Sequence, residues 1–212
     1  ALSFVTSESF GDGNPCERQH ANIVRDIVER GHKLGNHTET HLQLPFLNNA
    51  EIEAELARSA GKIGWAIGRN PRLISPPGGA LSKRVQGLLA DHGYSSVMWA
   101  LYPADLEVHT PEEVVRMFFH VLERREHDTG DRGGIVLMHD TKRHSVEALP
   151  RLVDALRRRN CELLDSDEEL YDVVDDLGYF IPGYVPDESV EERQAALRER
   201  TARECAALAL AD

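Results

Sequence analysis

Residues 27–41 read IVERGHKLGNHTETH, and the fold prediction starts from this stretch. Ile23 and Ile27 lie on one apolar face of a helix that should end at Gly31. A short strand is predicted next, over residues 33–36, and a polar segment with two histidines follows it directly. The stretch therefore predicts a helix that leads into a strand with possible ligand residues at the strand's carboxyl end.

The same alternation of short apolar runs and amphipathic helices continues on both sides of this stretch. Strands that alternate with helices imply parallel strands joined by helical crossovers, so the predicted fold class is α/β. The predicted strands cover residues 2–5, 33–36, 72–75, 95–101, 135–138 and 162–164.

Helix boundaries are marked by capping signals. Thr110-Pro111-Glu112-Glu113 predicts a helix start, with Thr110 as the cap, Pro111 in the first turn and Glu113 completing a capping box. Asn49 is expected to cap an earlier helix, the one that carries Ile52 and Leu56. Further helices are predicted at residues 82–92, 146–160, 167–176 and 188–210.

The composition excludes some classes of protein. Lys and Arg number 24 and Asp and Glu 36, a formal net charge of -12. Nucleic-acid binding and docking on an anionic membrane both need a basic surface, so neither partner is expected. No apolar run approaches the roughly 20 residues of a membrane span.

The three cysteines are Cys16, Cys161 and Cys205. They are widely spaced and odd in number, and none belongs to a CxxC pair. The pattern predicts isolated thiols and neither a disulfide framework nor a thiolate metal site.

His37 and His41 lie four residues apart just after the predicted strand. Imidazole suits Zn, Co, Ni or Fe, so a shared metal ion is one interpretation, and two surface histidines are the other. The arrangement differs from the HExxH motif of metalloproteases, because Thr38 stands where that motif has its glutamate.

His139 and Asp140 lie at the carboxyl end of the predicted strand 135–138. Parallel α/β folds place functional groups at this end of their strands. His139 is therefore a candidate proton donor or acceptor that Asp140 could orient. The alternative is a strand-end histidine bonded to a backbone carbonyl.

These segments together resemble the polysaccharide deacetylases of the NodB-homology type, carbohydrate esterase family 4. The resemblance runs from Phe4-Val5-Thr6 through IVERGHKLGNHTETH to Ile74-Ser75-Pro76-Pro77-Gly78-Gly79. It continues through Trp99-Ala100-Leu101-Tyr102-Pro103-Ala104-Asp105-Leu106 and Ile135-Val136-Leu137-Met138-His139-Asp140. Order and spacing agree over about residues 1–165.

The resemblance implies a distorted (β/α) barrel over residues 1–185, followed by a C-terminal helical tail at 186–212. It implies a divalent metal, often zinc, held by His37 and His41 together with an aspartate. It makes His139 the general acid, with Asp105 behind it. It implies substrate contacts from Leu137, Pro77 and Trp99.

The activity implied is hydrolysis of N-acetyl groups on an amino-sugar polysaccharide such as peptidoglycan, a chitin-like polymer or an exopolysaccharide. The family usually works outside the cytoplasm, which suggests an extracytoplasmic or cell-envelope location. The glycan, the metal and the oligomeric state are not predicted.

The sequence departs from the family pattern at several positions. The family's first motif, TFDDGP, carries the base and one metal ligand, and it precedes the strand that begins at Leu2. Asp12 follows this strand, so we assign it neither role. Ser75 replaces an arginine that orients the base. Gly78, Tyr102 and Leu106 replace a tyrosine, an aspartate and a tryptophan.

Two explanations of these departures stay open. In the first, the first strand and its aspartates lie upstream in a longer active enzyme. In the second, the chain is a degenerate member that binds carbohydrate or acts as a scaffold. A third and weaker function is hydrolysis of an amide in a small molecule.

Overall fold

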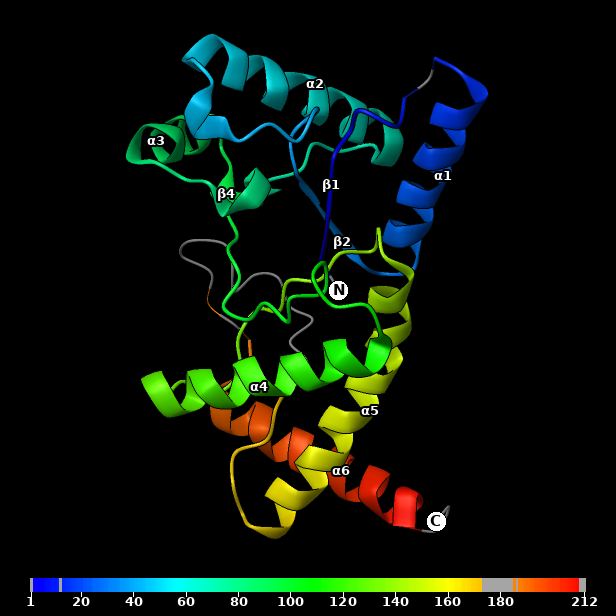
Figure 1. Ribbon diagram of the computed structural model, residues 1–212, viewed down its shortest axis with the longest axis vertical. Helices are drawn as coiled ribbons and strands as arrows, with labels where there is room; N and C mark the ends of the chain where they lie inside the picture. The colour runs from blue at the N-terminus through cyan, green and yellow to red at the C-terminus, as the bar shows by residue number, and fades with distance from the viewer. Residues whose placement is uncertain (1, 12, 173–184, 186, 210–212) are drawn as a thin grey trace. The chain divides into compact units, whose positions relative to one another are not determined.

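The computed structural model describes residues 2–11, 13–172, 185 and 187–209 (Figure 1). The described residues form two compact units. The first unit extends to Met98 and includes Val185, and the second contains residues 99–172 and 187–209. Asp12, which the sequence analysis assigned no metal role, lies outside the described residues.

The first unit contains a four-stranded parallel sheet in the order β1-β2-β3-β4, which confirms the predicted α/β class. The strands are β1 (Leu2–Val5), β2 (Lys33–Asn36), β3 (Leu73–Ile74) and β4 (Ser95–Ser96). The barrel implied by the resemblance stays a prediction.

Five helices accompany this sheet in the described part of the first unit. They are α1 (Pro15–Glu29), the 3-10 turn η1 (Leu44–Phe46), α2 (Asn49–Ile67), the 3-10 turn η2 (Pro77–Gly79) and α3 (Lys83–Asp91). Asn48 caps α2 in a capping box with Glu51, one residue before the predicted cap Asn49. The prediction of α2 is otherwise confirmed.

The sheet packs tightly where β1 meets β2. Gly35 lies opposite Phe4 in the ladder, and a Cβ at position 35 would lie 2.3 Å from a ring carbon of Phe4. Only glycine leaves room for this ring. The parallel ladder continues past the strand, because the His37 amide donates to the Val5 carbonyl at 3.0 Å. The carboxyl ends of β1 and β2 therefore meet at one edge, and His37 lies there.

Two apolar clusters stabilise this unit. The periodic residues of α1 and α2 form one cluster with Phe10, and those of α2 and α3 form the other with Leu44 and Ile74. Burial of these side chains fixes α1, α2 and α3 against the sheet. The fully or nearly buried members are Phe10, Ala21, Val24, Leu34, Ile63 and Ala66 in the first cluster and Leu44, Ile52, Leu56, Ile74, Val85 and Leu89 in the second.

The second unit consists mainly of three helices, α4 (Pro111–Thr129), α5 (Arg143–Asp165) and α6 (Val190–Ala209) (Figure 1). The capping box of Thr110 and Glu113 is present as predicted, and α6 confirms a helix in the C-terminal tail. The tail is tied to α5, because Leu163 and Leu197 are buried in one apolar cluster.

Four strand or helix predictions differ from the structure, three of them in this unit. The strand predicted at 135–138 is reduced to a single parallel bridge between Leu101 and Val136, and β4 ends at Ser96, far short of residue 101. The strand predicted at 162–164 is the last turn of α5, because Leu163 continues the buried face of that helix. Residues 167–172, the described part of the helix predicted at 167–176, are not helical.

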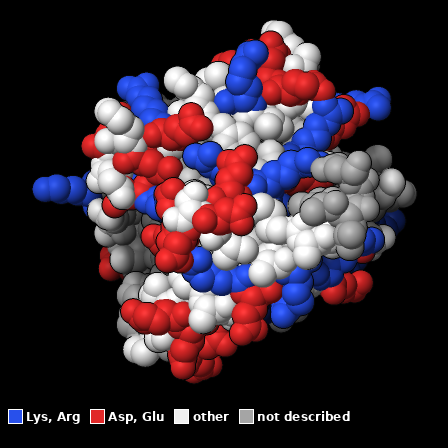
Figure 2. Space-filling view, turned by 90° about the horizontal axis from the view of Figure 1, so that it is seen from below, with Lys and Arg blue, Asp and Glu red and all other residues white. Residues whose placement is uncertain are grey.

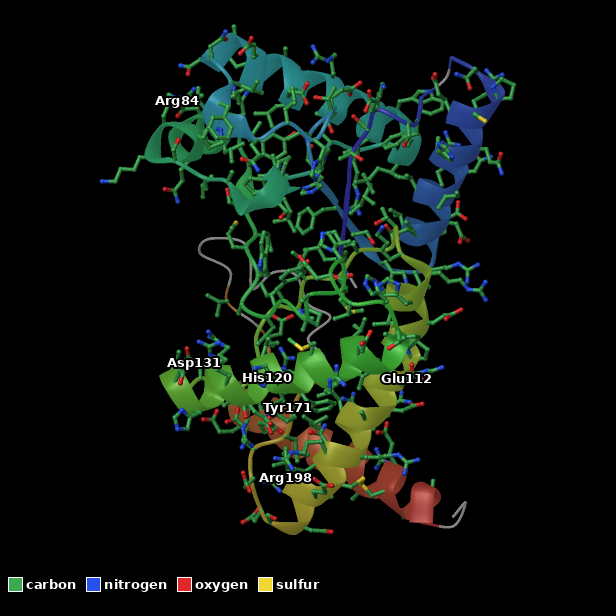
Figure 3. All side chains as sticks on the ribbon, viewed as in Figure 1. Arg84, Glu112, His120, Asp131, Tyr171 and Arg198 are labelled. Carbon is green, nitrogen blue, oxygen red and sulfur yellow. A yellow bond between two sulfur atoms is a disulfide. The ribbon has the colours of Figure 1, made fainter. Side chains whose placement is uncertain are left out.

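Tyr171 explains why the chain leaves the helical conformation there. The Asn160 side chain donates to the Tyr171 carbonyl and accepts from its amide, both at 2.8 Å, so these backbone groups bond to α5. The Tyr171 label lies beside α4 in Figure 3. The Tyr171 hydroxyl donates to Glu126 of that helix at 2.7 Å. An extended segment that satisfies its backbone on a helix side chain has no need of helical bonds.

The prediction of isolated cysteines is also wrong for two of the three. Cys161 of α5 and Cys205 of α6 form a disulfide, with their Cα atoms 5.8 Å apart. The sequence separation of 44 residues gave no sign of this pairing, because packing of the two helices brings the thiols together. Cys16 is a free, exposed thiol.

The surface agrees with the acidic composition. On the face shown in Figure 2, the described basic side chains stand among acidic ones and form no large basic area. Within the part of the chain that the structure describes, no helix is long and apolar enough to cross a membrane.

Candidate functional site

His37 and His41 come from one loop at the carboxyl edge of the sheet in the first unit. Their rings are neighbours, with centroids 4.9 Å apart and planes inclined by 67°. His37 Nδ1 lies 2.6 Å from the Ser75 carbonyl oxygen, which can only accept, so Nδ1 carries the proton. The lone pair of the neutral ring is then on Nε2. This is the arrangement in which a second partner orients a metal-binding histidine.

The loop has an unusual backbone. Thr38 has φ 69° and His41 has φ 62°, a left-handed conformation that non-glycine residues adopt at a cost. Hydrogen bonds within residues 36–41 hold the backbone at both positions. The Thr38 amide donates to the Asn36 side chain at 2.7 Å, and the His41 amide donates to Thr38 Oγ1 at 3.1 Å. Strain of this kind is concentrated at functional sites.

The polar side chains of Asn36, Ser59 and Tyr94 hold the loop in place. Asn36 is fully buried at the end of β2. Its oxygen also accepts from Ser59 Oγ of α2 at 2.8 Å, and its amide donates to the Tyr94 hydroxyl at 2.9 Å. Asn36 thus bonds to the buried Ser59 and to the half-buried Tyr94 as well as to the loop, which favours a single arrangement of the loop.

Glu39 ties the loop to the segment after β1. Its carboxylate accepts from Ser7 Oγ at 2.7 Å and from Lys62 Nζ at 2.9 Å. Burial acts to raise the pKa of Glu39, but the hydrogen bonds from Lys62 and Ser7 outweigh it and hold the pKa below its usual value. Glu39 is therefore a structural carboxylate in this loop.

The two imidazoles fit a divalent first-row metal as two of its ligands. Within the residues that the structure describes, no group of three His, Cys, Asp or Glu side chains could hold a metal ion. The described part of the chain therefore offers two ligands from His37 and His41, and a third is not found there.

Pro77 lies in the turn next to Ser75. The turn Pro77–Gly79 has Gly78 at φ 62° and Gly79 at φ 66°, so glycine is needed at both positions. Pro77 is buried, and Ser75, at the position where the family carries an arginine, is 4% exposed. The Ser75 carbonyl holds His37, but its short side chain cannot replace a guanidinium.

His139 and Asp105 lie together in the second unit. Asp105 is fully buried, and its two oxygens accept from the His139 amide at 2.7 Å and from His139 Nδ1 at 3.0 Å. A carboxylate at Nδ1 fixes the proton there and leaves Nε2 to exchange a proton with a substrate. The His139 side chain is 33% exposed, so Nε2 is on a partly accessible ring.

The backbone of Asp105 is held in place by two side chains of α5. Its carbonyl accepts from His144 Nε2 at 2.8 Å and from Ser145 Oγ at 3.4 Å, both in the first turn of α5. Asp140, which the sequence analysis offered as the partner that orients His139, is exposed. The structure gives that position to Asp105 instead.

Tyr102 packs its ring edge-on against His139, with centroids 6.1 Å apart. Its hydroxyl donates to Glu107 at 2.7 Å. Burial, and then the bond to Glu107, raise the pKa of Tyr102 to about 12. Tyr102 is thus a neutral neighbour of His139 where the family has an aspartate.

Trp99 and Leu137 belong to the second unit with His139, and both are half-buried. The Leu137 amide donates to the Leu101 carbonyl at 2.9 Å, which fixes the backbone two residues before His139. The predicted substrate contacts of Leu137, Trp99 and Pro77 stay predictions.

The sequence analysis missed the groups that hold the histidines: Asn36, Glu55, Ser59, Tyr94 and His144. Glu55 had a recognisable signal. It lies on the inner face of α2 between Ile52 and Leu56, where an apolar residue is expected, and it is 3% exposed. A carboxylate on the apolar face of a helix indicates a buried polar partner.

Comparison with known proteins finds one matching family and several similar proteins. Residues 1–97 match the family described as polysaccharide deacetylase. Chitin deacetylase 1 of Saccharomyces cerevisiae is 33% identical over 128 residues, which cover 60% of this chain and 42% of that protein. The peptidoglycan-N-acetylglucosamine deacetylase of Bacillus cereus is 26% identical over 153 residues, 70% of this chain and 68% of that protein.

A solved structure adds a likeness in fold. A CE4 family pseudoenzyme from Bacillus anthracis superposes with a TM-score of 0.63 at 22% identity, over 75% of this chain and 51% of that one. This chain spans less than half the length of the yeast relative. The matched residues 1–97 include both loop histidines, so the similarity to the polysaccharide deacetylase family covers the loop of the first unit.

Proposed function

We propose that the protein is a metal-dependent deacetylase that hydrolyses N-acetyl groups of an amino-sugar polysaccharide, such as peptidoglycan, a chitin-like polymer or an exopolysaccharide. The observation that carries the proposal is the pair His37 and His41. His37 is oriented by the Ser75 carbonyl so that its Nε2 holds the lone pair. The printed names of the relatives support the substrate class.

His37 and His41 would hold the metal, most suitably Zn²⁺, with Co²⁺, Ni²⁺ or Fe²⁺ as alternatives. A divalent metal, when bound, polarises an acyl carbonyl and lowers the pKa of water. The loop backbone and Asn36 keep the two rings beside each other before any metal binds. Pre-organised ligands of this kind lose little entropy on binding.

His139 would donate the proton that the leaving amine requires. Its Nδ1–H donates to the fully buried Asp105 carboxylate, so the ring presents Nε2. Proton donation by a positioned histidine contributes about 10²- to 10⁴-fold to a rate. Leu137, Trp99 and Pro77 are proposed to contact the substrate.

An extracytoplasmic or cell-envelope location fits this activity. The relatives are named for chitin and peptidoglycan, which are wall polymers. The disulfide between Cys161 and Cys205 adds an independent argument, because such bonds persist in oxidising compartments and are rare in the cytosol.

The test is acetate release from N-acetylated chitooligosaccharide, peptidoglycan and exopolysaccharide by the full-length protein. His37→Ala should lower both metal content and acetate release to background, and His139→Ala should lower release while metal content is retained. His127→Ala, an exposed histidine of α4, is the matched control and should change neither. Full activity and full metal content in His37→Ala would refute the proposal.

The second candidate is a degenerate member that binds carbohydrate or serves as a scaffold. Two observations favour it: Ser75 at the position of the family's arginine, and the likeness in fold to a pseudoenzyme. It predicts that the wild-type protein binds the glycans in a pull-down without releasing acetate from any of them.

A further inference from the structure

Glu55 is a buried carboxylate directed at the loop between the two histidines. It belongs to α2 and is 3% exposed. Its Oε2 accepts from the Glu39 amide at 3.0 Å and from the Thr40 amide at 2.8 Å. Its Oε1 accepts from Thr40 Oγ1 at 3.0 Å and from Arg58 at 2.9 Å.

Burial of the Glu55 carboxylate costs free energy, so its presence in α2 requires an explanation. A carboxylate taken out of water must recover its lost hydration through hydrogen bonds. Three of the four bonds to Glu55 come from Glu39 and Thr40, the two residues that stand between Thr38 and His41. An apolar residue at position 55 would pack α2 without this requirement, so packing does not explain the glutamate.

The geometry of the loop shows what the carboxylate does. Thr38 and His41, on either side of residues 39–40, have left-handed backbones, with φ 69° and 62°. Such residues relax to ordinary conformations unless their surroundings hold them. Glu55 binds the two amides between them and so prevents the loop from relaxing, and His41 is the exposed end of that loop.

Glu39 cannot take over this task. Its side chain is bonded to Ser7 and Lys62, and it links the loop to the segment that follows β1. Asn36 acts at the other end of the loop, on the Thr38 amide. The amides of residues 39 and 40 are thus bound by Glu55 from α2.

We infer that Glu55 is a positioning residue that sets the place of His41 relative to His37 and thereby the affinity for a divalent metal. This inference rests on the metal-binding part of the proposed function and needs no assumption about the substrate. Partners that orient metal ligands typically change metal affinity by roughly 10- to 100-fold when mutated.

The experiment measures Zn²⁺ affinity of the full-length protein by competition with a chromophoric chelator, well below the melting temperature. Glu55→Gln keeps the size of the side chain but turns an acceptor oxygen into a donor NH₂ that faces other donors. We expect Zn²⁺ affinity to fall roughly 10- to 100-fold. The Co²⁺-loaded variant should also show an altered visible absorption spectrum, because the ligand geometry changes.

A second variant guards against loss of folding. Thr40→Val removes one hydroxyl donor from a half-buried loop residue and leaves Glu55 in place, so the fold should be retained. Its Zn²⁺ affinity should fall less than that of Glu55→Gln, and Thr40→Ser should restore it. Glu53→Gln, an exposed carboxylate on the same helix, is the charge control and should bind Zn²⁺ like the wild type.

Wild-type affinity and an unchanged Co²⁺ spectrum in folded Glu55→Gln would overturn the inference, as would metal content in the wild type that does not depend on His37. The fate of the proposed function is read separately, from acetate release. A wild-type protein that binds Zn²⁺ through His37 but releases no acetate refutes the deacetylase proposal and leaves the loss of affinity in Glu55→Gln as support for Glu55.

Discussion

The histidines of the two units are held in contrasting ways. In the first unit, the loop of His37 and His41 is held by Asn36 of β2, by Ser59 and Glu55 of α2, and by Tyr94, which directly precedes β4. In the second unit, His139 is held by Asp105, which takes both its amide and its Nδ1. In the proposed function, the loop must keep two rings in place to bind a metal, whereas His139 as a proton donor needs one ring and one tautomer.

The contrast extends to how each unit is stabilised. The described part of the first unit has a parallel sheet and two apolar clusters that join it to its helices. The described part of the second unit has a single strand bridge and three helices, and two of these are joined by a disulfide. Loss of one hydroxyl donor, such as that of Ser59, should therefore change the first site little, whereas loss of Asp105 or of the disulfide should have a strong effect in the second unit.

Asp105→Asn should have the largest effect. The amide retains the size of the carboxylate but not its charge, and it favours the wrong tautomer of His139. We expect kcat/KM for acetate release to fall roughly 100- to 1000-fold. Asp140→Asn, the exposed neighbour, is the control and should stay near wild type. Equal losses in both variants would contradict the assignment of Asp105.

Cys205→Ser should destabilise the second unit. The disulfide closes a loop with a sequence separation of 44 residues. In the loop-entropy description such a bond stabilises by about 4 kcal/mol, and measured values are typically about 2–4 kcal/mol. Denaturant unfolding of oxidised protein measures the loss, with Cys16→Ser as the control. A Cys205→Ser protein as stable as the wild type would show that the bond does not stabilise the fold.

Ser59→Ala tests whether the first site absorbs the loss of one bond. It removes the hydroxyl that donates to Asn36 and leaves the bonds of Asn36 to Thr38 and Tyr94. The expected loss of stability is about 1 kcal/mol, the value of one ordinary hydrogen bond. Zn²⁺ affinity should change by less than it does in Glu55→Gln. A loss of metal binding as great as that of Glu55→Gln would show that the remaining bonds of Asn36 are not enough to hold the loop.

The smallest effect is expected from Tyr102 at high pH. Its pKa is raised from 10.0 to about 12, chiefly by burial, so the folded state favours the neutral phenol. The resulting stability is fully present below pH 10 and is lost as pH rises from about 10 to about 12. Tyr102→Phe should remove this slope when unfolding is compared at about pH 9 and about pH 11.

Tyr94 in the first unit provides the matched comparison. Burial also raises its pKa, while the bond from Asn36 opposes the shift. Tyr94→Phe should therefore also reduce the loss of stability between about pH 9 and about pH 11. If stability rose between these two pH values in the wild type but not in the variants, the sign assigned to both tyrosines would be wrong.

The sequence predicted the first unit well because its signals are local. Apolar periodicity placed α1 and α2 in the first unit, and a capping box likewise placed α4 in the second unit. The metal loop indicated by the spacing of His37 and His41 stays a prediction. The predictions failed where the outcome depended on distant partners. The last turn of α5 was read as a strand, although Leu163 continues a helical face that packs against α6.

The sequence alone determined the α/β class, the helix starts and the histidine pair, because periodicity, capping and ligand chemistry act over a few residues. The tertiary structure decided between Asp140, which the strand end suggested, and Asp105, which the resemblance implied, as the partner of His139. It alone showed that Glu55 holds the histidine loop and that Cys161 bonds to Cys205. These contacts join residues 16 to 44 positions apart. Packing sets which of many possible partners meet, and no local pattern records that choice.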